Sequence, residues 1–320
     1  MRAIVQDRYG EVDVLQLRDI PTPPTKDDEV LIEVRAGGLD PGVWHLMTGL
    51  PYLVRLIGHG LRKQVRGMDV AGVVETVGNA VRGFQPGDEV FGTCHGSFAE
   101  YTAARQDTLA HKPTNLTFEE AAVVPVSACT ALQALQNQGR VKASQRVLII
   151  GAGGGVGTFA VQIAKPYGAE VTGVCSTTKT ELVRSIGADS VIDYTREDVA
   201  DGHNRYDLVV DTAGRRPLSQ LRRALTPHGT IVIVGGEGGG RWLAVFDRGF
   251  RGQLIGPVVR QRIRQLSTKV NHDDLVVLKD LIEAGKIRPV IDTTFPLSEV
   301  PKAIRRWEDG HSHGKIAITI

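Results

Sequence analysis

The sequence has few cysteines, little net charge and no long apolar run, and each shortage excludes a class of protein. Its three cysteines, Cys94, Cys129 and Cys175, lie far apart in 320 residues, so they form neither a disulfide framework nor a zinc-finger pattern. The formal net charge of +2 gives no electrostatic case for binding nucleic acid or an anionic membrane. No apolar run approaches the ~20 residues of a membrane span. Because the first residues also lack a signal-peptide core, we expect a cytoplasmic protein that binds neither nucleic acid nor membrane.

What the sequence does contain changes in character along the chain. Residues 1–122 hold short alternating runs, such as VLIEVRAG at 30–37, separated by turns of Pro, Gly and Asp, which indicates a β-rich domain. Apolar strands alternate with helices over 123–286, and this alternation predicts a parallel sheet covered on both faces. Residues 287–320 return to a β-rich pattern, so we expect this tail to rejoin the first domain.

The glycine-rich stretch RVLIIGAGGGVGTFAVQIAK, at 146–165, has the layout of a dinucleotide site. A buried strand leads through glycines into a helix, whose free N–H groups and positive end attract phosphate. Glycine or alanine permits close approach of the phosphate. Ala152 occupies the first slot of the usual G-x-G-x-x-G pattern, and Gly154 and Gly157 follow. A structural turn is the alternative, but the βαβαβ context favours a dinucleotide.

The end of the next strand predicts which dinucleotide is bound. NAD sites usually place an acidic residue there for the ribose diol, whereas this chain reads CSTTK at 175–179. Ser176, Thr177 and Thr178 offer hydroxyl groups, and Lys179 offers a positive charge, which together suit a 2′-phosphate. The same residues also suit the cap of the next helix, and both roles can hold together. We therefore predict NADPH in preference to NADH.

Five segments resemble the medium-chain dehydrogenase/reductase superfamily. They are VGNAVRGFQPGDEVFG (77–92), GSFAEYTAA (96–104), AAVVPVSACTALQAL (121–135), GAGGGVGTFAVQIAK (151–165) and GKIAITI (314–320). Within the superfamily they are most similar to the zinc-independent quinone oxidoreductase branch, the relatives of zeta-crystallin. The resemblance implies an α/β protein, with a GroES-like catalytic domain and a Rossmann domain built on a doubly wound parallel sheet. It also implies a homodimer.

Departures from the zinc-dependent members concern the metal ligands. Those members carry a Cys near residue 38 and a His-Glu pair after a glycine of the segment that here reads RGMDVAGVV. This chain has Gly37 and Gly38 in the first region, and Met68 and Asp69 after Gly67. Methionine is a poor zinc ligand, and the lobe of four cysteines that holds structural zinc is missing. We therefore expect no metal.

The resemblance also implies roles for single residues. Thr130 is expected beside the nicotinamide, Tyr194 near the phosphates, and Gly235 and Gly236 at the carboxamide. Lys315 lies in a segment that contacts the cofactor in the family. The predicted cofactor ligands are Thr130, Ala152, Gly154, Gly155, Val156, Gly157, Ser176, Thr177, Lys179, Tyr194, Gly235, Gly236 and Lys315.

Three residues are candidates for a catalytic role. Asp40 lies where the quinone oxidoreductases often carry Asn, although an Asp before Pro41 is also typical of a turn. Tyr52 is a candidate proton donor or ring-stacking residue, with a simple loop position as the alternative. The hydroxyl of Thr130 could bind the nicotinamide ring or the substrate, whereas a neutral helix position is the other interpretation.

The absence of zinc ligands points to an acceptor that is already electrophilic. A quinone or an enone takes a hydride and leaves negative charge on oxygen, which hydrogen bonds stabilise, while the cofactor performs the difficult step. We therefore predict a zinc-independent, NADPH-dependent reduction of a quinone or similar electrophile. An enone or 2-alkenal double-bond reductase and a non-catalytic NADPH-binding protein are the alternatives.

Overall fold

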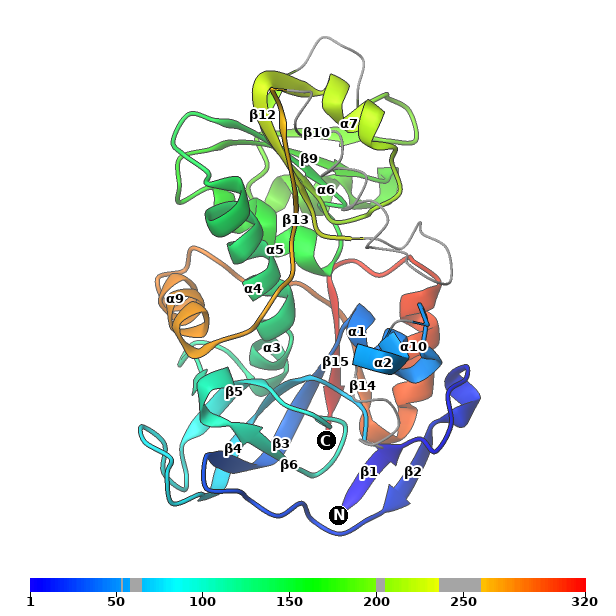
Figure 1. The fold of residues 1–320 in the computed structure, drawn as a ribbon, viewed down its shortest axis with the longest axis vertical. Coiled ribbons are helices and arrows are strands. Elements are labelled where there is room, and N and C mark those ends of the chain that lie inside the picture. The colour runs from blue at the N-terminus through cyan, green and yellow to red at the C-terminus, as the bar shows by residue number, and fades with distance from the viewer. Residues whose placement is uncertain (53, 58–64, 200–204, 236–259) are drawn as a thin grey trace. The chain divides into compact units, whose positions relative to one another are not determined.

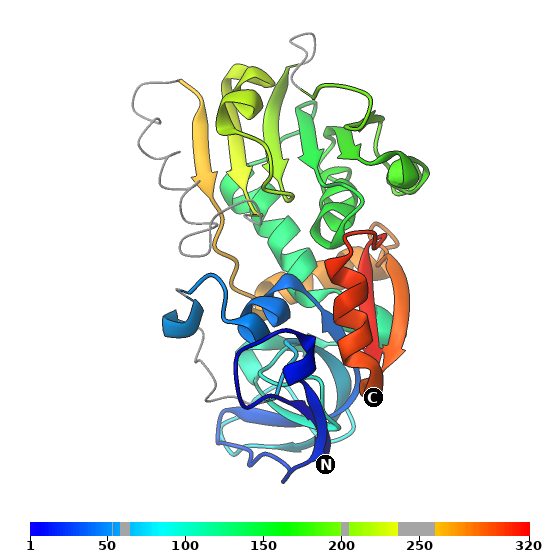
Figure 2. The same cartoon turned by 90° about the vertical axis from the view of Figure 1, so that its right-hand side faces the viewer.

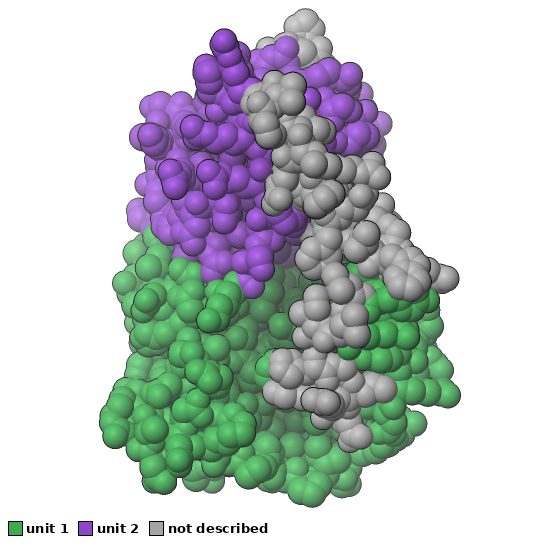
Figure 3. Space-filling model, in the orientation of Figure 1, with its two compact units in different colours: residues 1–129, 269–285, 289–320 green, residues 130–268, 286–288 purple. Residues whose placement is uncertain are grey.

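The computed structural model describes residues 1–52, 54–57, 65–199, 205–235 and 260–320 (Figure 1, with the same ribbon turned by 90° in Figure 2). The chain divides into two compact units, which Figure 3 colours separately. Unit 1 consists of Met1–Cys129, Lys269–Gly285 and Pro289–Ile320, and unit 2 of Thr130–Thr268 and Lys286–Arg288. Within the described residues, no helix combines the length and the apolar character needed to cross a membrane.

Unit 1 is built on a seven-stranded sheet with the order β14-β15-β3-β4-β5-β7, in which β6 also pairs with β3. Strand β14 runs parallel to β15, and the other pairs are antiparallel. The strands are β3 (Glu29–Leu39), β4 (Asp69–Val77), β5 (Glu89–Thr93), β6 (Tyr101–Arg105), β7 (Leu109–His111), β14 (Ile291–Pro296) and β15 (Lys315–Thr319). A separate antiparallel pair joins β1 (Arg2–Val5) to β2 (Gln16–Asp19). The last strands of the chain therefore extend the sheet that its first third begins.

Several helices accompany this sheet in unit 1, and most of them bury apolar side chains. They are α1 (Pro41–Thr48), α2 (Val54–Ile57), α3 (Phe118–Ala122), α9 (His272–Glu283) and α10 (Val300–Glu308). One core cluster brings Leu39, Met47 and Phe98 together with Ile304 and Ile318 from the end of the chain. This burial of apolar side chains from both ends of the sequence holds the tail on the first segment.

The position of α9 differs from the expected boundary at residue 286. We expected this helix with the parallel-sheet segment, whereas it belongs to unit 1. His272 Nδ1 lies 2.8 Å from the carbonyl oxygen of Leu109, and the Thr114 N–H and hydroxyl donate to Glu283 at 2.9 and 3.0 Å. The amphipathic pattern of a helix shows that one face is buried, but it does not show which sheet buries it.

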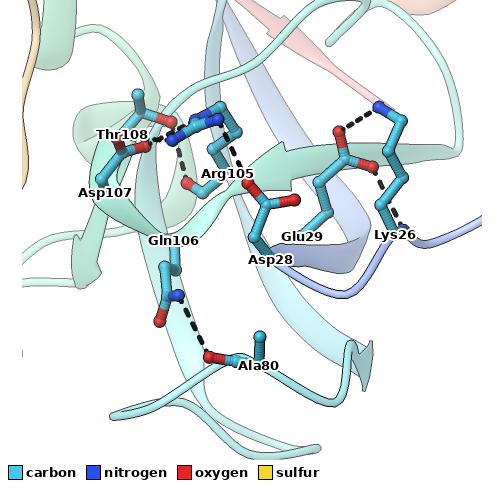
Figure 4. Close-up of polar contacts among 8 residues, drawn as sticks. All are labelled: Lys26, Asp28, Glu29, Ala80, Arg105, Gln106, Asp107 and Thr108. Carbon is cyan, nitrogen blue, oxygen red and sulfur yellow. Dashed lines mark hydrogen bonds and ion pairs between the residues drawn. The ribbon is translucent and has the colours of Figure 1, made fainter.

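The Arg105–Asp28 ion pair joins the start of β3 to the end of β6, and two local ion pairs lie beside it (Figure 4). Arg105 lies 3.1 Å from Asp28 and 3.0 Å from Asp107, while Lys26 lies 2.7 Å from Glu29. Such exposed pairs contribute little to stability, because water screens their charges. The pairing of Glu29 with Arg105 in the β3–β6 ladder therefore depends mainly on the backbone hydrogen bonds and the buried faces of the strands.

Unit 2 contains the parallel sheet that the strand–helix alternation predicts. Its order is β10-β9-β8-β11-β12-β13, and every neighbouring pair is parallel; Figure 2 shows the strands side by side. They are β8 (Arg146–Ile150), β9 (Glu170–Cys175), β10 (Ser190–Asp193), β11 (Tyr206–Asp211), β12 (Leu225–Ile233) and β13 (Arg262–Gln265). The central strands are apolar and buried, as expected for a sheet covered on both faces.

The order of these strands fixes where a ligand can bind. The chain runs from β8 through α5 (Gly155–Ala164) to β9, and through α6 (Thr180–Ser185) to β10 on the same side. It then returns past β8 to β11 and, through α7 (Leu218–Arg223), to β12. Since sheets of this kind bind ligands at the carboxyl ends of the strands, where the order reverses, the glycine loop after β8 lies at the expected point.

Candidate cofactor site

The glycine loop connects the buried end of β8 to the first turn of α5. Gly151 has a positive φ of 83°, and the N–H groups of Gly151 and Ala152 donate to the carbonyl of Val174 at 3.0 Å each. Gly154 is the N-cap of α5, and the Thr158 N–H donates to its carbonyl at 2.9 Å. The N–H groups of the first helical turn precede this hydrogen-bond ladder, so they can receive a phosphate.

Steric contacts explain why each of these positions in the glycine loop carries a small residue. A Cβ on Gly157 would lie 2.0 Å from the Gly151 carbonyl oxygen, so glycine permits the close packing of helix and loop. A Cβ on Gly154 would meet only that oxygen, at 3.3 Å, so the space in front of Gly154 is open. Ala152 is buried, and its methyl group packs against Gly173 of β9. The loop is thus a cradle that a diphosphate fits.

The segment after β9 lies directly against this cradle. Residues Thr177–Lys179 form a short 3-10 turn, and the Lys179 side chain covers Gly153, where a Cβ would meet Lys179 Cδ at 2.7 Å. The hydroxyl oxygens of Ser176 and Thr178 are 3.3 Å apart. Ser176, at the N-cap of this turn, makes no side-chain capping hydrogen bond. The next helix, α6, has Lys179 at its N-cap and also lacks a side-chain capping hydrogen bond, so the alternative capping role of this segment is not observed.

Two further predicted ligands also follow the carboxyl ends of strands. Tyr194, 51 % exposed, comes directly after β10, and its N–H donates to the Cys175 carbonyl at 3.1 Å. Gly235 follows β12, and its N–H donates to the Asp211 carbonyl at 3.1 Å. Unit 2 thus gathers the glycine loop, the 176–179 segment, Tyr194 and Gly235 at one edge of its sheet. Gly236 lies outside the described residues.

Thr130 is the first residue of unit 2 and lies on α4 (Pro125–Gln133). It is buried, with 6 % of its surface exposed. Its helix continues into a π-helical turn, η4 (Ala134–Gly139). Such turns interrupt the regular ladder and frequently occur at functional sites.

Unit 1 contains a buried group of ionisable side chains that the sequence did not reveal as a group. Asp69 is fully buried and Lys315 is 3 % exposed, and Lys315 Nζ lies 3.4 Å from Asp69 Oδ2. The other oxygen of Asp69 accepts from the Val126 N–H at 2.9 Å. Lys315, which we predicted as a cofactor ligand, is therefore a buried partner of Asp69.

Asp40 belongs to the same group. Its Oδ1 accepts from the Gly42 N–H at 2.7 Å and caps α1, which agrees with the turn interpretation. Its Oδ2 is buried without a hydrogen-bond partner among the described residues. The Asp40 carboxyl group is therefore removed from solvent, whether its role is catalytic or structural.

Burial controls the charge of these carboxyl groups. It raises the pKa of Asp69 to about 7, although Lys315 and the Val126 N–H act in the opposite direction. Burial also raises the pKa of Asp40, against the opposing effects of Lys315 and the N–H groups of Gly42 and Val43. Burial therefore favours the protonated form of Asp40, because its ionised form would place negative charge on a buried oxygen that lacks a hydrogen-bond partner among the described residues.

Tyr52 is half-buried before α2. The Arg55 guanidinium lies 4.8 Å from the centre of the Tyr52 ring and 4.6 Å from that of Tyr9. The ring therefore takes part in a cation–π contact.

The residues that stand where zinc-dependent relatives carry ligands do not fit a zinc ion. Gly38 lies beside Asp69, and a Cβ there would meet the Ala122 carbonyl oxygen at 2.4 Å. Met68 Sδ lies near Gly42, 3.0 Å from where a Cβ on that glycine would be. In the described part of the chain, no three His, Cys, Asp or Glu side chains are grouped as metal ligands would be.

Comparisons with known proteins match the chain along most of its length. The family described as alcohol dehydrogenase GroES-like domain matches residues 26–133, and the family described as zinc-binding dehydrogenase matches residues 186–318. A 2-methylene-furan-3-one reductase from Solanum lycopersicum is 35 % identical over 99 % of this chain and 79 % of its own length. An NADPH-dependent alkenal/one oxidoreductase, chloroplastic, from Arabidopsis thaliana is 36 % identical with the same coverage. The solved structure of the quinone oxidoreductase from Coxiella burnetii is 32 % identical, with a TM-score of 0.90, over 100 % of this chain and 99 % of that one.

Proposed function

Because this chain belongs to the medium-chain dehydrogenase/reductase family, in its quinone oxidoreductase branch, we propose that it transfers a hydride from NADPH to a quinone or a similar electrophile without zinc. It is an oxidoreductase that uses a nicotinamide cofactor. The observation that supports NADPH most directly is the contact of the 176–179 segment with the glycine loop, through Lys179 and Gly153.

The loop and the segment divide the binding of NADPH between them. The N–H groups of Gly155, Val156 and Gly157 meet the diphosphate at the start of α5. Ser176 and Lys179 meet the 2′-phosphate, with a hydroxyl group and a positive charge. Sequence and geometry support the same assignment here, because the segment that carries these groups has no carboxylate to repel the phosphate.

The bound cofactor supplies the hydride, and the chain must then stabilise charge on the acceptor oxygen. Hydroxyl groups suit this task, because they donate a hydrogen bond as the negative charge forms. The Thr130 hydroxyl and the Tyr52 phenol are the proposed donors. Asp40 is not a donor to the acceptor in this proposal, because its Oδ1 caps α1 and its Oδ2 is buried.

A cofactor comparison tests the first part of the proposal. We expect the wild-type protein to bind NADPH at least about tenfold more tightly than NADH, as one or two charge-assisted hydrogen bonds provide. Lys179→Glu should reverse this preference, whereas Lys142→Glu, an equal charge change at an exposed position, should leave it unchanged. Tighter binding of NADH to the wild-type protein would refute the assignment.

A turnover assay tests the acceptor. NADPH oxidation is measured with 1,4-naphthoquinone and with a 2-alkenal, with and without a zinc chelator. We expect faster turnover with the quinone and no effect of the chelator. Turnover of the alkenal alone would favour an enone or 2-alkenal double-bond reductase, and one of the relatives is named as an alkenal/one oxidoreductase. Tight NADPH binding without turnover of either acceptor would favour a non-catalytic protein, and loss of activity with the chelator would overturn the zinc-free chemistry.

We also propose that the chain forms a homodimer, as the resemblance implied. Light scattering coupled to size-exclusion chromatography would test this assembly. A mass near 34.6 kDa, that of one chain, would contradict it.

A further inference from the structure

Asp193, at the end of β10, holds the segment that we assign to the 2′-phosphate. The Thr177 hydroxyl donates to Asp193 Oδ2 at 2.5 Å. The Thr195 N–H and hydroxyl donate to Asp193 Oδ1 at 2.9 and 2.7 Å. Both carboxylate oxygens are therefore engaged, and one of them reaches across to the loop after the neighbouring strand.

The strand register brings these groups together. Asp193 is paired with Cys175 in the parallel β9–β10 ladder, so both strands end at the same level and their loops begin side by side. The hydroxyl oxygens of Thr177 and Thr195 are 3.1 Å apart. The carboxylate of Asp193 thus lies between two loops and contacts both.

Hydrogen-bond donors and a nearby arginine compensate the negative charge of Asp193. The hydrogen bonds from Thr177 and Thr195 lower the pKa of Asp193 below its usual value, so it is ionised at neutral pH. Arg196 Nε lies 3.7 Å from Asp193 Oδ2. A carboxylate with these partners can stand near a phosphate site without presenting an uncompensated negative charge to it.

The hydrogen bond to Asp193 also limits what Thr177 can do. A threonine hydroxyl has one proton to donate, and here it is donated to Asp193. Within the 176–179 segment, Ser176 and Lys179 are therefore the groups that we assign to the phosphate, and Thr177 is not. Because Lys179 packs on Gly153, its position depends on how firmly the turn is held.

We propose that Asp193 is a positioning residue of the 2′-phosphate subsite, acting through Thr177 to hold Ser176 and Lys179 against the glycine loop. This inference rests on the proposed use of NADPH. It predicts that the selectivity for NADPH depends on a carboxylate on the neighbouring strand, as well as on the residues that touch the phosphate.

Cofactor binding to matched variants tests the proposal. Asp193→Ala should weaken NADPH binding about tenfold, the loss of one charge-assisted hydrogen bond, and should change NADH binding less than about twofold. Thr177→Val, which removes only the hydroxyl, should reproduce this effect. Asp193→Asn keeps one acceptor oxygen and should recover part of the affinity.

A control separates this effect from general destabilisation. Asp189 directly precedes β10, at the opposite end of that strand from Asp193, and it accepts from Lys165 at 2.7 and 2.6 Å and from the Val171 N–H at 2.7 Å. Asp189→Ala should lower the melting temperature without changing the ratio of the two dissociation constants.

Hydrogen exchange provides a measurement without cofactor. The Lys179 N–H donates to the Ser176 carbonyl at 3.0 Å, and it should exchange faster in Asp193→Ala and in Thr177→Val. Unchanged exchange, or NADPH affinity that stays the same or rises in Asp193→Ala, would overturn the positioning role alone. A loss in Thr177→Val without one in Asp193→Ala would make Thr177 a direct ligand and overturn it too. Equal affinity of the wild-type protein for both cofactors would instead overturn the NADPH preference itself.

Discussion

Replacement of Lys315 by methionine tests how much the buried ion pair of unit 1 contributes to stability. The substitution keeps most of the side-chain volume and removes the ammonium that lies 3.4 Å from Asp69 Oδ2. Because both side chains are almost entirely buried, water cannot replace the missing charge. We expect the loss to depend on pH, since Asp69 can escape an uncompensated charge only by taking up a proton.

The structure gives both the sign and the size of this effect. Burial is the main reason that the pKa of Asp69 is raised from 3.8 to about 7. The protonated carboxyl therefore makes its full contribution to the stability of the folded state below pH 4. This contribution is lost as the pH rises through 7. The loss amounts to about 4 kcal/mol. Without Lys315 the pKa rises further, so the loss continues above pH 7. At pH 9, breaking a buried pair should cost about 3–5 kcal/mol, or roughly 5–15 °C in melting temperature.

Thermal and urea unfolding of Lys315→Met at pH 5 and pH 9 would measure this difference. Lys165→Met is the control, because Lys165 lies closer to its partner Asp189, at 2.6 Å, but the two side chains are 34 % and 41 % exposed; its cost should stay below about 1 kcal/mol at both pH values. Adding Asp69→Asn to Lys315→Met should restore stability at pH 9. Equal losses at pH 5 and pH 9, or equal losses in the two lysine variants, would refute the reasoning.

Two further predictions concern the glycine loop and Asp40. Gly157→Ala places a Cβ 2.0 Å from the Gly151 carbonyl oxygen, so this variant should lose about 1–3 kcal/mol of stability. In Gly154→Ala the Cβ lies 3.3 Å from that oxygen, so this variant should keep its stability without cofactor but bind NADPH more weakly. Melting curves with and without NADPH would test this pair, and equal apo stability of both variants would contradict it. Asp40→Asn should keep stability within about 1 kcal/mol at pH 6 and reduce the loss of stability with rising pH that comes from the raised pKa of Asp40, whereas Asp40→Ala should lose about 1 kcal/mol of capping energy at all pH values. Urea titrations from pH 6 to 10 would show the difference, and an Asn variant as unstable as the Ala variant would count against a raised pKa of Asp40.

The features that the sequence predicted well depend on neighbours along the chain. The strand, glycine loop and helix of 146–165 are contiguous, so the spacing of apolar residues and glycines specifies them directly. The parallel sheet of unit 2 is confirmed for the same reason, since strand–helix alternation leaves few other topologies. The segment at 175–179 was located correctly at the end of β9, because it follows the last buried residue of that strand.

The features that escaped prediction join residues that are distant in sequence. Asp69 and Lys315 are 246 positions apart, and neither is preceded by a local pattern that marks a buried partner. Gly38 gave an indirect signal: its lack of a side chain was interpreted as the loss of a metal ligand, but it also permits the close approach of Asp69 and the Ala122 carbonyl. The sequence shows that residue 38 has no side chain, but it does not show which groups occupy the space beside it.

The 176–179 segment shows the same limit within a single site. From the sequence, each of its hydroxyl groups is an equal candidate for the 2′-phosphate, because residue type states only that a proton can be donated. The structure distinguishes them: Thr177 donates to Asp193, and Lys179 is placed by its packing on Gly153. Selectivity for NADPH would then arise from the register of β9 and β10, which sets the distance from Asp193 to Thr177, as much as from the charge of Lys179. A variant that keeps Lys179 but releases Thr177 should therefore lose selectivity although every direct ligand is still present.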